Sequence, residues 1–248
     1  MSFSQAIEWR AALCAALLLV IGVFTPHSGA IAGMVSLSPL RVYFAGDQQS
    51  GVVRIQNTGD DTIAMQVESR QWLQGPDGAD VYEDTQDVLA VPPIFSLEPG
   101  ETQLVRVGLM TQQPANSEST YRLFFTELPP PRDEAGGGQL RMRLRISMPL
   151  FVAPVTDVNA ELKFVSAAAE DGGVRATFHN PGNTHVRIDE LKALDGNGRE
   201  TQRRQQAAYL LPGSTRDFFF DSADDESITR LIAVTDTAGT REYEVATP

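Results

Sequence analysis

The sequence predicts an all-β protein built from two small sandwich domains. Three observations predict this fold class. Short segments of alternating polar and apolar residues recur along the chain, turn residues separate them, and no window of a dozen residues has a convincing apolar period of 3.6 residues. With 248 residues, 42% of them hydrophobic, the chain is long enough for two domains that each have a core.

The N-terminal segment has the pattern of a secretory signal. Arg10 is followed by an uncharged apolar run over residues 11–24, and small residues surround Ala32. The run is shorter than the roughly 20 residues that a membrane-spanning helix needs. We therefore expect residues 1–32 to be a cleaved signal peptide and the mature chain to have no membrane span, with a retained signal anchor as the alternative. Cys14, the only cysteine, would leave with this segment, which excludes disulfides and thiol chemistry in the mature chain.

Alternating segments over residues 33–155 are expected to form the first domain. Residues 57–61, 75–78 and 98–100 separate them and are rich in Gly, Pro, Asn and Asp, which favour turns. About six or seven strands in roughly 120 residues suit an immunoglobulin-like sandwich. The expected strands cover residues 40–44, 51–56, 64–73, 103–109, 121–128 and 140–152.

The composition changes near residue 155, after which a second series of strands begins. We expect a second sandwich domain over residues 156–248. Turns at residues 171–173, 180–183 and 195–198 provide glycine and asparagine, which tolerate the backbone conformations of tight hairpins. The expected strands cover residues 160–166, 174–179, 186–193, 208–211, 216–220 and 231–235.

The charge and the polar residues exclude several classes of function. The chain has 32 acidic and 20 basic residues and a formal net charge of −12, so nucleic acid is not an expected partner. His179 and His185 flank a tight turn without a supporting ligand framework, so we interpret them as loop histidines and expect no metal site. No nucleophile–base pair or phosphate loop is visible, so we expect no cofactor and no enzyme activity, with a hydrolase as a remote alternative.

The segment over residues 140–152 differs from an ordinary core strand in its length. At about 3.3 Å per residue it would reach about 43 Å, roughly twice the usual length of a strand. Its apolar residues alternate strictly with arginines and a serine, which is typical of a half-buried strand with its polar face in water. A long edge strand with exposed apolar residues instead favours pairing with a partner chain. The apolar row consists of Leu140, Met142, Leu144, Ile146 and Met148.

Three motifs lie in order along the first domain: LSPLRVYF at residues 37–44, VPPIFSLEPG at residues 91–100 and YRLFFTELPP at residues 121–130. Together they resemble the periplasmic chaperones of the chaperone–usher pilus pathway, the PapD-like family. The second domain matches only weakly, through Asn-Pro-Gly-Asn at residues 180–183. The local sequences are similar to the archaic branch, which serves spore-coat-U-like pilins. The resemblance implies two immunoglobulin-like β-sandwich domains arranged as a boomerang.

The resemblance also implies a function. In this family the last long strand of the first domain is lent to a pilin or fimbrial subunit, which is then passed to an outer-membrane usher. A chaperone located in the periplasm is therefore expected, with the apolar row of residues 140–148 as the donor surface. Self-association through the exposed donor strand is a further expectation. The alternative is a secreted sandwich that adheres or binds a ligand, in which this strand would be ordinary core.

A site for the subunit's terminal carboxylate is the last feature that the resemblance implies. In the family, one arginine and one lysine hold this carboxylate. Arg41 matches the arginine, but no lysine occurs in the first domain, and Arg122 is the candidate for the second cation. A guanidinium suits this role because it binds a carboxylate through two parallel hydrogen bonds. The alternative for both residues is a solvated or ion-paired arginine on a strand.

Overall fold

The computed structural model describes residues 35–110, 115–129, 143–170, 172–205, 207–221, 228–237 and 239–245. Every regular element in these ranges is a β-strand, and they contain no helix of the length and apolarity that a membrane span requires. The expected signal peptide lies outside the described residues.

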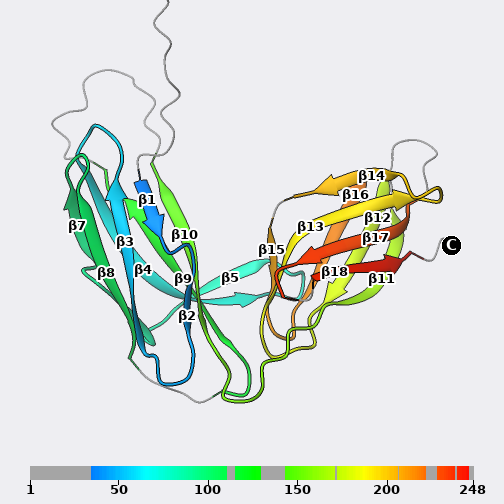
Figure 1. Cartoon of the computed structure of the whole chain (residues 1–248), viewed down its shortest axis with the longest axis horizontal. Helices are drawn as coiled ribbons and strands as arrows, with labels where there is room; N and C mark the ends of the chain where they lie inside the picture. The colour runs from blue at the N-terminus through cyan, green and yellow to red at the C-terminus, as the bar shows by residue number, and fades with distance from the viewer. Residues whose placement is uncertain are drawn as a thin grey trace, which may run out of the picture. The chain divides into compact units, whose positions relative to one another are not determined.

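The strands within residues 35–152 form two sheets that enclose one core (Figure 1). Alternate residues of a strand point to opposite faces, so each strand sends one row of side chains into this core. One sheet has the order β1 (Val35–Ser38), β3 (Ser50–Asn57), β8 (Thr102–Leu109) and β6 (Val88–Val91). The other has the order β2 (Val42–Phe44), β10 (Arg145–Val152), β9 (Ser119–Glu127), β4 (Ile63–Gln74) and β5 (Asp80–Asp84), with β7 (Ile94–Leu97) also paired to β4.

The strands within residues 163–244 form a second pair of sheets around a separate core. The all-β fold with two β-sandwiches is therefore confirmed, while the boundary near residue 155 stays a prediction. One sheet has the order β11 (Lys163–Glu170), β12 (Gly173–His179) and β16 (Thr215–Asp221). The other has the order β14 (Glu200–Arg204), β13 (Val186–Asp195), β17 (Ile228–Thr235) and β18 (Gly239–Glu244), with β15 (Ala208–Leu210) also paired to β13.

The strand expected over residues 40–44 is β2 in the structure, and a further strand, β1, precedes it in the other sheet. Strand β1 pairs with β3 in one sheet, whereas β2 pairs with β10 in the other. Pro39 lies between them and has no N–H group to donate to a ladder, which suits a position where pairing changes. The N-terminal strands therefore contribute to both sheets of the first sandwich.

A buried asparagine forms one corner of the first sandwich. Asn57 is 0% exposed, and its Nδ2 donates hydrogen bonds to the carbonyl oxygens of Asp61 (2.8 Å) and Leu97 (3.0 Å). Its Oδ1 accepts a hydrogen bond from the N–H of Gly59 at 2.9 Å. One side chain therefore closes its own turn and ties it to the loop that begins at Leu97.

Asn180 forms the same corner in the second sandwich. It is also 0% exposed, and its Nδ2 donates to the carbonyl oxygens of Thr184 (2.8 Å) and Leu210 (3.0 Å). Its Oδ1 accepts from the N–H of Gly182 at 2.9 Å. The two sandwiches therefore share a corner in which all three hydrogen bonds are equivalent.

Candidate functional site

Strand β10 has an unpaired edge along its first half. Strand β9 pairs with the whole of β10, from Arg145 to Val152, whereas β2 pairs in parallel with Leu150–Val152 only. Among the residues that the structure describes, no strand pairs with the second edge of residues 145–149. The main-chain groups of this edge are a template for a strand from another chain.

The apolar row of β10 continues the row of core side chains. Leu150 is 0% exposed, and Ile146 is partly buried and packs against the same core. Leu144, just before the strand, is also partly buried, while Arg145 and Ser147 on the opposite face are exposed. The side chains therefore become less buried toward the N-terminal end of β10, where the sandwich ends.

The predicted donor residues have different positions in this row. Leu144 and Ile146 lie at the partly buried end, as a donor surface requires. Met148 is 2% exposed and belongs to the core of the chain's own sandwich. We therefore do not include it in the donor surface, although the sequence pattern predicts it there. Leu140 and Met142 lie outside the described residues.

Leu144 marks the point where pairing to the neighbouring strand stops. Its carbonyl oxygen accepts a hydrogen bond from the N–H of Glu127 (2.9 Å), and its own N–H donates to the Oε2 of Glu127 (3.1 Å). Glu127 is the last residue of β9. Among the described residues, the pairing of β9 with the segment that leads into β10 therefore ends at Leu144.

Arg122 lies on the outer face of the same sheet, on top of an aromatic side chain. Its Cζ is 3.7 Å from the ring centroid of Trp72 and 5.4 Å from that of Tyr209. Burial lowers the pKa of the Arg122 guanidinium, and the nearby Tyr82 and Asp80 oppose this shift. Its Nε is buried and has no hydrogen-bond partner in the described ranges. Arg122 therefore has a donor that a carboxylate could use.

Arg41, the other predicted cation, is already bound to an acidic residue. Its Nη1 lies 3.3 Å from the Oδ2 of Asp236 and 3.5 Å from the hydroxyl of Tyr43. Asp236 lies in the turn between β17 and β18, 195 residues further along the chain. No described contact joins Arg41 to Arg122, so the two predicted cations bind different neighbours.

An aromatic cluster connects the neighbourhoods of these two arginines. Phe151 of β10 is 0% exposed and stacks on His185, with ring centroids 3.7 Å apart, and on Tyr43 at 5.2 Å. The ring of Phe151 also lies 6.0 Å from Trp72 and 5.8 Å from Tyr209. Aromatic rings of both sandwiches therefore pack around Phe151 and fix the position of the C-terminal half of β10.

Polar contacts support the same cluster. The Nδ1 of His185 lies 2.8 Å from the Oε1 of Glu118, and both side chains are almost completely buried. Gln74 of β4 donates to the carbonyl oxygen of Tyr209 (2.8 Å) and accepts from the N–H of Leu211 (2.9 Å). His185 does follow a turn, but it is a buried, hydrogen-bonded residue rather than an ordinary loop histidine. The described residues contain no group of three or more side chains that could hold a metal ion.

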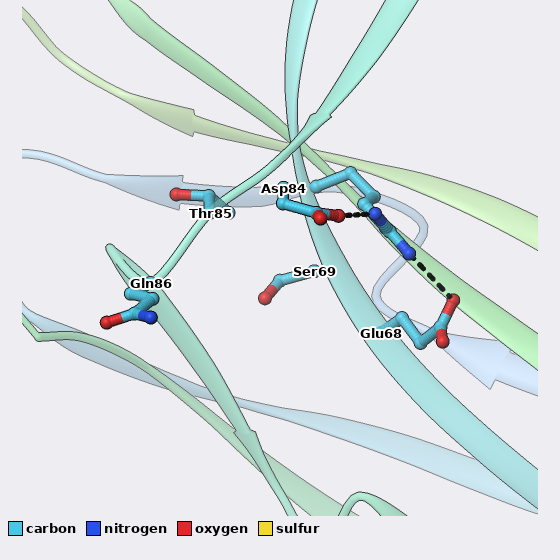
Figure 2. A pocket seen from close by; sticks show the side chains of 6 residues that line it. Glu68, Ser69, Asp84, Thr85 and Gln86 are labelled. Carbon is cyan, nitrogen blue, oxygen red and sulfur yellow. Dashed lines mark ion pairs between the residues drawn. The ribbon is translucent and has the colours of Figure 1, made fainter.

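A separate pocket of ≈ 380 Å³ lies beside the last residues of β5 (Figure 2). Arg70 forms ion pairs with Asp84 and, at 3.8 Å, with Glu68, and these pairs are the dashed lines in Figure 2. The hydroxyl of Ser69 donates to the carbonyl oxygen of Val88 at 2.6 Å. Because its charged groups are already engaged in ion pairs with one another, we assign no function to this pocket.

Comparisons with known proteins agree with these features. Residues 34–156 match the family described as pili and flagellar-assembly chaperone, PapD N-terminal domain. The chaperone protein PmfD of Proteus mirabilis is 29% identical over 147 residues, which cover 57% of this chain and 52% of PmfD. The chaperone protein PapD of Escherichia coli is 29% identical over 130 residues, covering 51% of each chain. This chain thus spans about half the length of the curated relatives that it matches.

The fold of almost the whole described chain is similar to that of a solved chaperone. The structure is that of the CsuC–CsuE chaperone–tip adhesion subunit pre-assembly complex from the archaic chaperone–usher Csu pili of Acinetobacter baumannii. The two chains superpose with a TM-score of 0.65 and 19% identity, over 86% of this chain and 98% of the other. At this identity the likeness shows the fold, and the sequence match to the first sandwich shows the family. Residues 34–156, which make up slightly less than half of the chain, therefore belong to the family described as pili and flagellar-assembly chaperone, PapD N-terminal domain.

Proposed function

We propose that this chain is a periplasmic, non-enzymatic chaperone that binds pilin subunits by donor-strand complementation and delivers them to an outer-membrane usher. The observation that carries this proposal is the unpaired edge of β10 beside a row of apolar side chains that ends at the rim of the sandwich. Main-chain pairing along such an edge supplies affinity, while the apolar side chains set the register.

The donor surface that we propose consists of Leu144 and Ile146, preceded along the chain by Leu140 and Met142. Each of these side chains would contribute on the order of 1.5–3 kcal/mol if a subunit buried it fully. The C-terminal half of β10 does not take part, because its side chains already fill the chain's own core. That half instead holds the donor segment on the sandwich.

The comparisons support the kind of partner and its location. The similar Csu structure contains a chaperone together with a tip adhesion subunit, which supports a pilus subunit as the partner of this chain. The pattern of residues 1–32 supports export and cleavage, and with it a location in the periplasm. Arg41 is the cation that we propose for the subunit's terminal carboxylate, and Arg122 is one candidate for the second cation.

The test is co-expression in a bacterial periplasm with a spore-coat-U-like pilin, followed by recovery of the 1:1 complex. Leu144→Asp places a charge in the apolar row, and we expect it to lower the recovered complex at least about tenfold, since a buried unpaired carboxylate is strongly unfavourable. Ser147→Asp is the matched control, because it adds the same charge to the exposed face of the same strand. If Leu144→Asp is folded and recovers as much pilin as Ser147→Asp, donation through this row is wrong.

A further inference from the structure

Asp236 lies between two arginines that belong to different sandwiches. Its Oδ2 is 3.3 Å from the Nη1 of Arg41 and 3.9 Å from the Nε of Arg187. Its Oδ1 accepts a hydrogen bond from the backbone N–H of Arg187 at 3.2 Å. The chain therefore already contains one carboxylate bound at a site with two guanidinium groups.

Arg187 is held in place and still has an unused donor. Its Nη2 lies 2.6 Å from the Oδ1 of Asp189, which fixes the orientation of the guanidinium. Its Nε is buried and has no hydrogen-bond partner within the part of the chain that the structure describes. A buried donor without a partner is unfavourable. A carboxylate oxygen placed slightly closer than that of Asp236 would satisfy it.

We propose that Arg41 and Arg187 together form the site for the terminal carboxylate of the subunit, and that Asp236 occupies this site in the free chaperone. The inference rests on the proposed function and adds to it the second cation and the mode of binding. Arg187 comes from the second sandwich, which explains how an anchor can exist although the first sandwich has no lysine.

The charges require exchange of one carboxylate for another. Arg41 and Arg187 carry two positive charges, and Asp189 and Asp236 carry two negative charges, so the cluster is neutral before a subunit arrives. A further carboxylate is attracted only when one of the internal carboxylates leaves. Asp236 is the residue that leaves, because it lies in a surface turn, where rotation of its side chain returns the carboxylate to water.

The experiment uses the full mature chain and a defined carboxylate. N-acetyl-Ala-Ala is titrated as the free acid and as the C-terminal amide, and the arginine Nε–H signals are followed by nuclear magnetic resonance. In Asp236→Asn we expect the acid to half-saturate the site at about fivefold lower concentration than in the unchanged chain, the factor that corresponds to about 1 kcal/mol for a partly exposed ion pair. The signals of Arg41 and Arg187 move together, and the amide leaves both unchanged.

A matched control removes an equal charge elsewhere in the second sandwich. Glu242 pairs with Arg230 at 2.9 Å and does not contact Asp236, so Glu242→Gln should bind the acid like the unchanged chain. Arg187→Gln in the Asp236→Asn chain should abolish the gain in affinity. If Asp236 only stabilised the fold, its replacement would lower the melting temperature without any gain in affinity for the acid.

Several outcomes would overturn the inference. One is an Asp236→Asn chain that binds the acid no better than Glu242→Gln, and another is a response of Arg41 and Arg122 that leaves the Arg187 signal in place. The titration contains no pilin, so it reports on this site even if donation by β10 fails. A negative titration likewise leaves the Leu144→Asp experiment unchanged, and the two proposals can fail separately.

Discussion

The corners formed by Asn57 and Asn180 have the same hydrogen bonds but different surroundings. In each sandwich the asparagine side chain closes its own turn and binds the loop opposite. In the first sandwich the residues that follow, Asp60 and Asp61, are exposed. In the second sandwich Thr184 is buried, and the corner leads directly into the aromatic cluster.

Asn183 shows how the second corner is connected to other parts of the chain. Its backbone N–H donates to the carbonyl oxygen of Asn159 (2.9 Å), and its side-chain Oδ1 accepts from the N–H of Asn159 (2.7 Å). Its Nδ2 donates to the carbonyl oxygen of Asn116 (3.2 Å), and its own carbonyl oxygen accepts from the N–H of Glu118 (2.8 Å). The same local geometry therefore closes a turn in one sandwich and also anchors two connecting segments in the other.

The largest expected effect is the loss of either asparagine. Asn57→Ala and Asn180→Ala each remove three hydrogen bonds around a buried polar group, and we expect each to lower the free energy of unfolding by about 3 kcal/mol. Asn180→Ala should lower the free energy of unfolding more than Asn57→Ala, because Thr184 would move and its neighbour His185 would pack less well in the aromatic cluster. Urea unfolding followed by circular dichroism measures both, with Asp60→Ala as the exposed control. Equal losses for the two variants would mean that the second corner does not support the aromatic cluster.

A smaller effect is expected at Gly182, where another segment packs closely on the second corner. A Cβ at this position would lie 2.2 Å from the carbonyl oxygen of Asn159, so Gly182→Ala should lower the free energy of unfolding by about 2 kcal/mol through overpacking. Gly213→Ala is the control. Gly213 has a φ of +74° and nothing within 4 Å of the added Cβ, so only the backbone conformation is strained, at about 1 kcal/mol. A Gly182→Ala chain as stable as Gly213→Ala would contradict close packing of Asn159.

The smallest expected effect is a response of the first sandwich to alkaline pH. Burial, together with the nearby Asp87 carboxylate that accepts its hydrogen bond, raises the pKa of Tyr121 from 10.0 to about 12. Between these values the unfolded chain loses the proton and the folded chain keeps it, so the free energy of unfolding falls as the pH rises. Tyr121→Phe should make this fall shallower in unfolding curves measured from pH 9 to pH 12. An unchanged slope would show that the folded hydroxyl titrates normally.

The strands with one buried face could be predicted from the sequence, and those without one could not. Strand β3 alternates between buried and exposed residues, and the sequence predicts it within two residues of its ends. Strand β5 is exposed along its whole length, and β14 is rich in charged residues, so neither has an apolar row to reveal it. The placement of β1 and β2 in different sheets also depends on their partner strands β3 and β10, which the local sequence does not indicate.

The candidate site was predictable only in part for the same reason. The apolar row that contains Leu144 is visible in the sequence, but only packing shows that Met148 belongs to the core. Arg41 was found through a family motif, whereas its partner Asp236 lies in an ordinary turn sequence. No local signal indicates that Arg187 approaches the same carboxylate, because that contact depends on the pairing of β13 with β17, and the contact of Asp236 with Arg41 depends on how the two sandwiches meet.

The division of the N-terminal strands between two sheets has a consequence for the order in which the chain folds. Strand β1 pairs with β3, which follows it closely in the sequence. Strand β2 instead pairs with Leu150–Val152 at the end of β10. A chain that crosses a membrane with its N-terminus first must therefore deliver more than a hundred residues before β2 can pair. Until then, the first sandwich stays open at the place where β2 and the end of β10 meet.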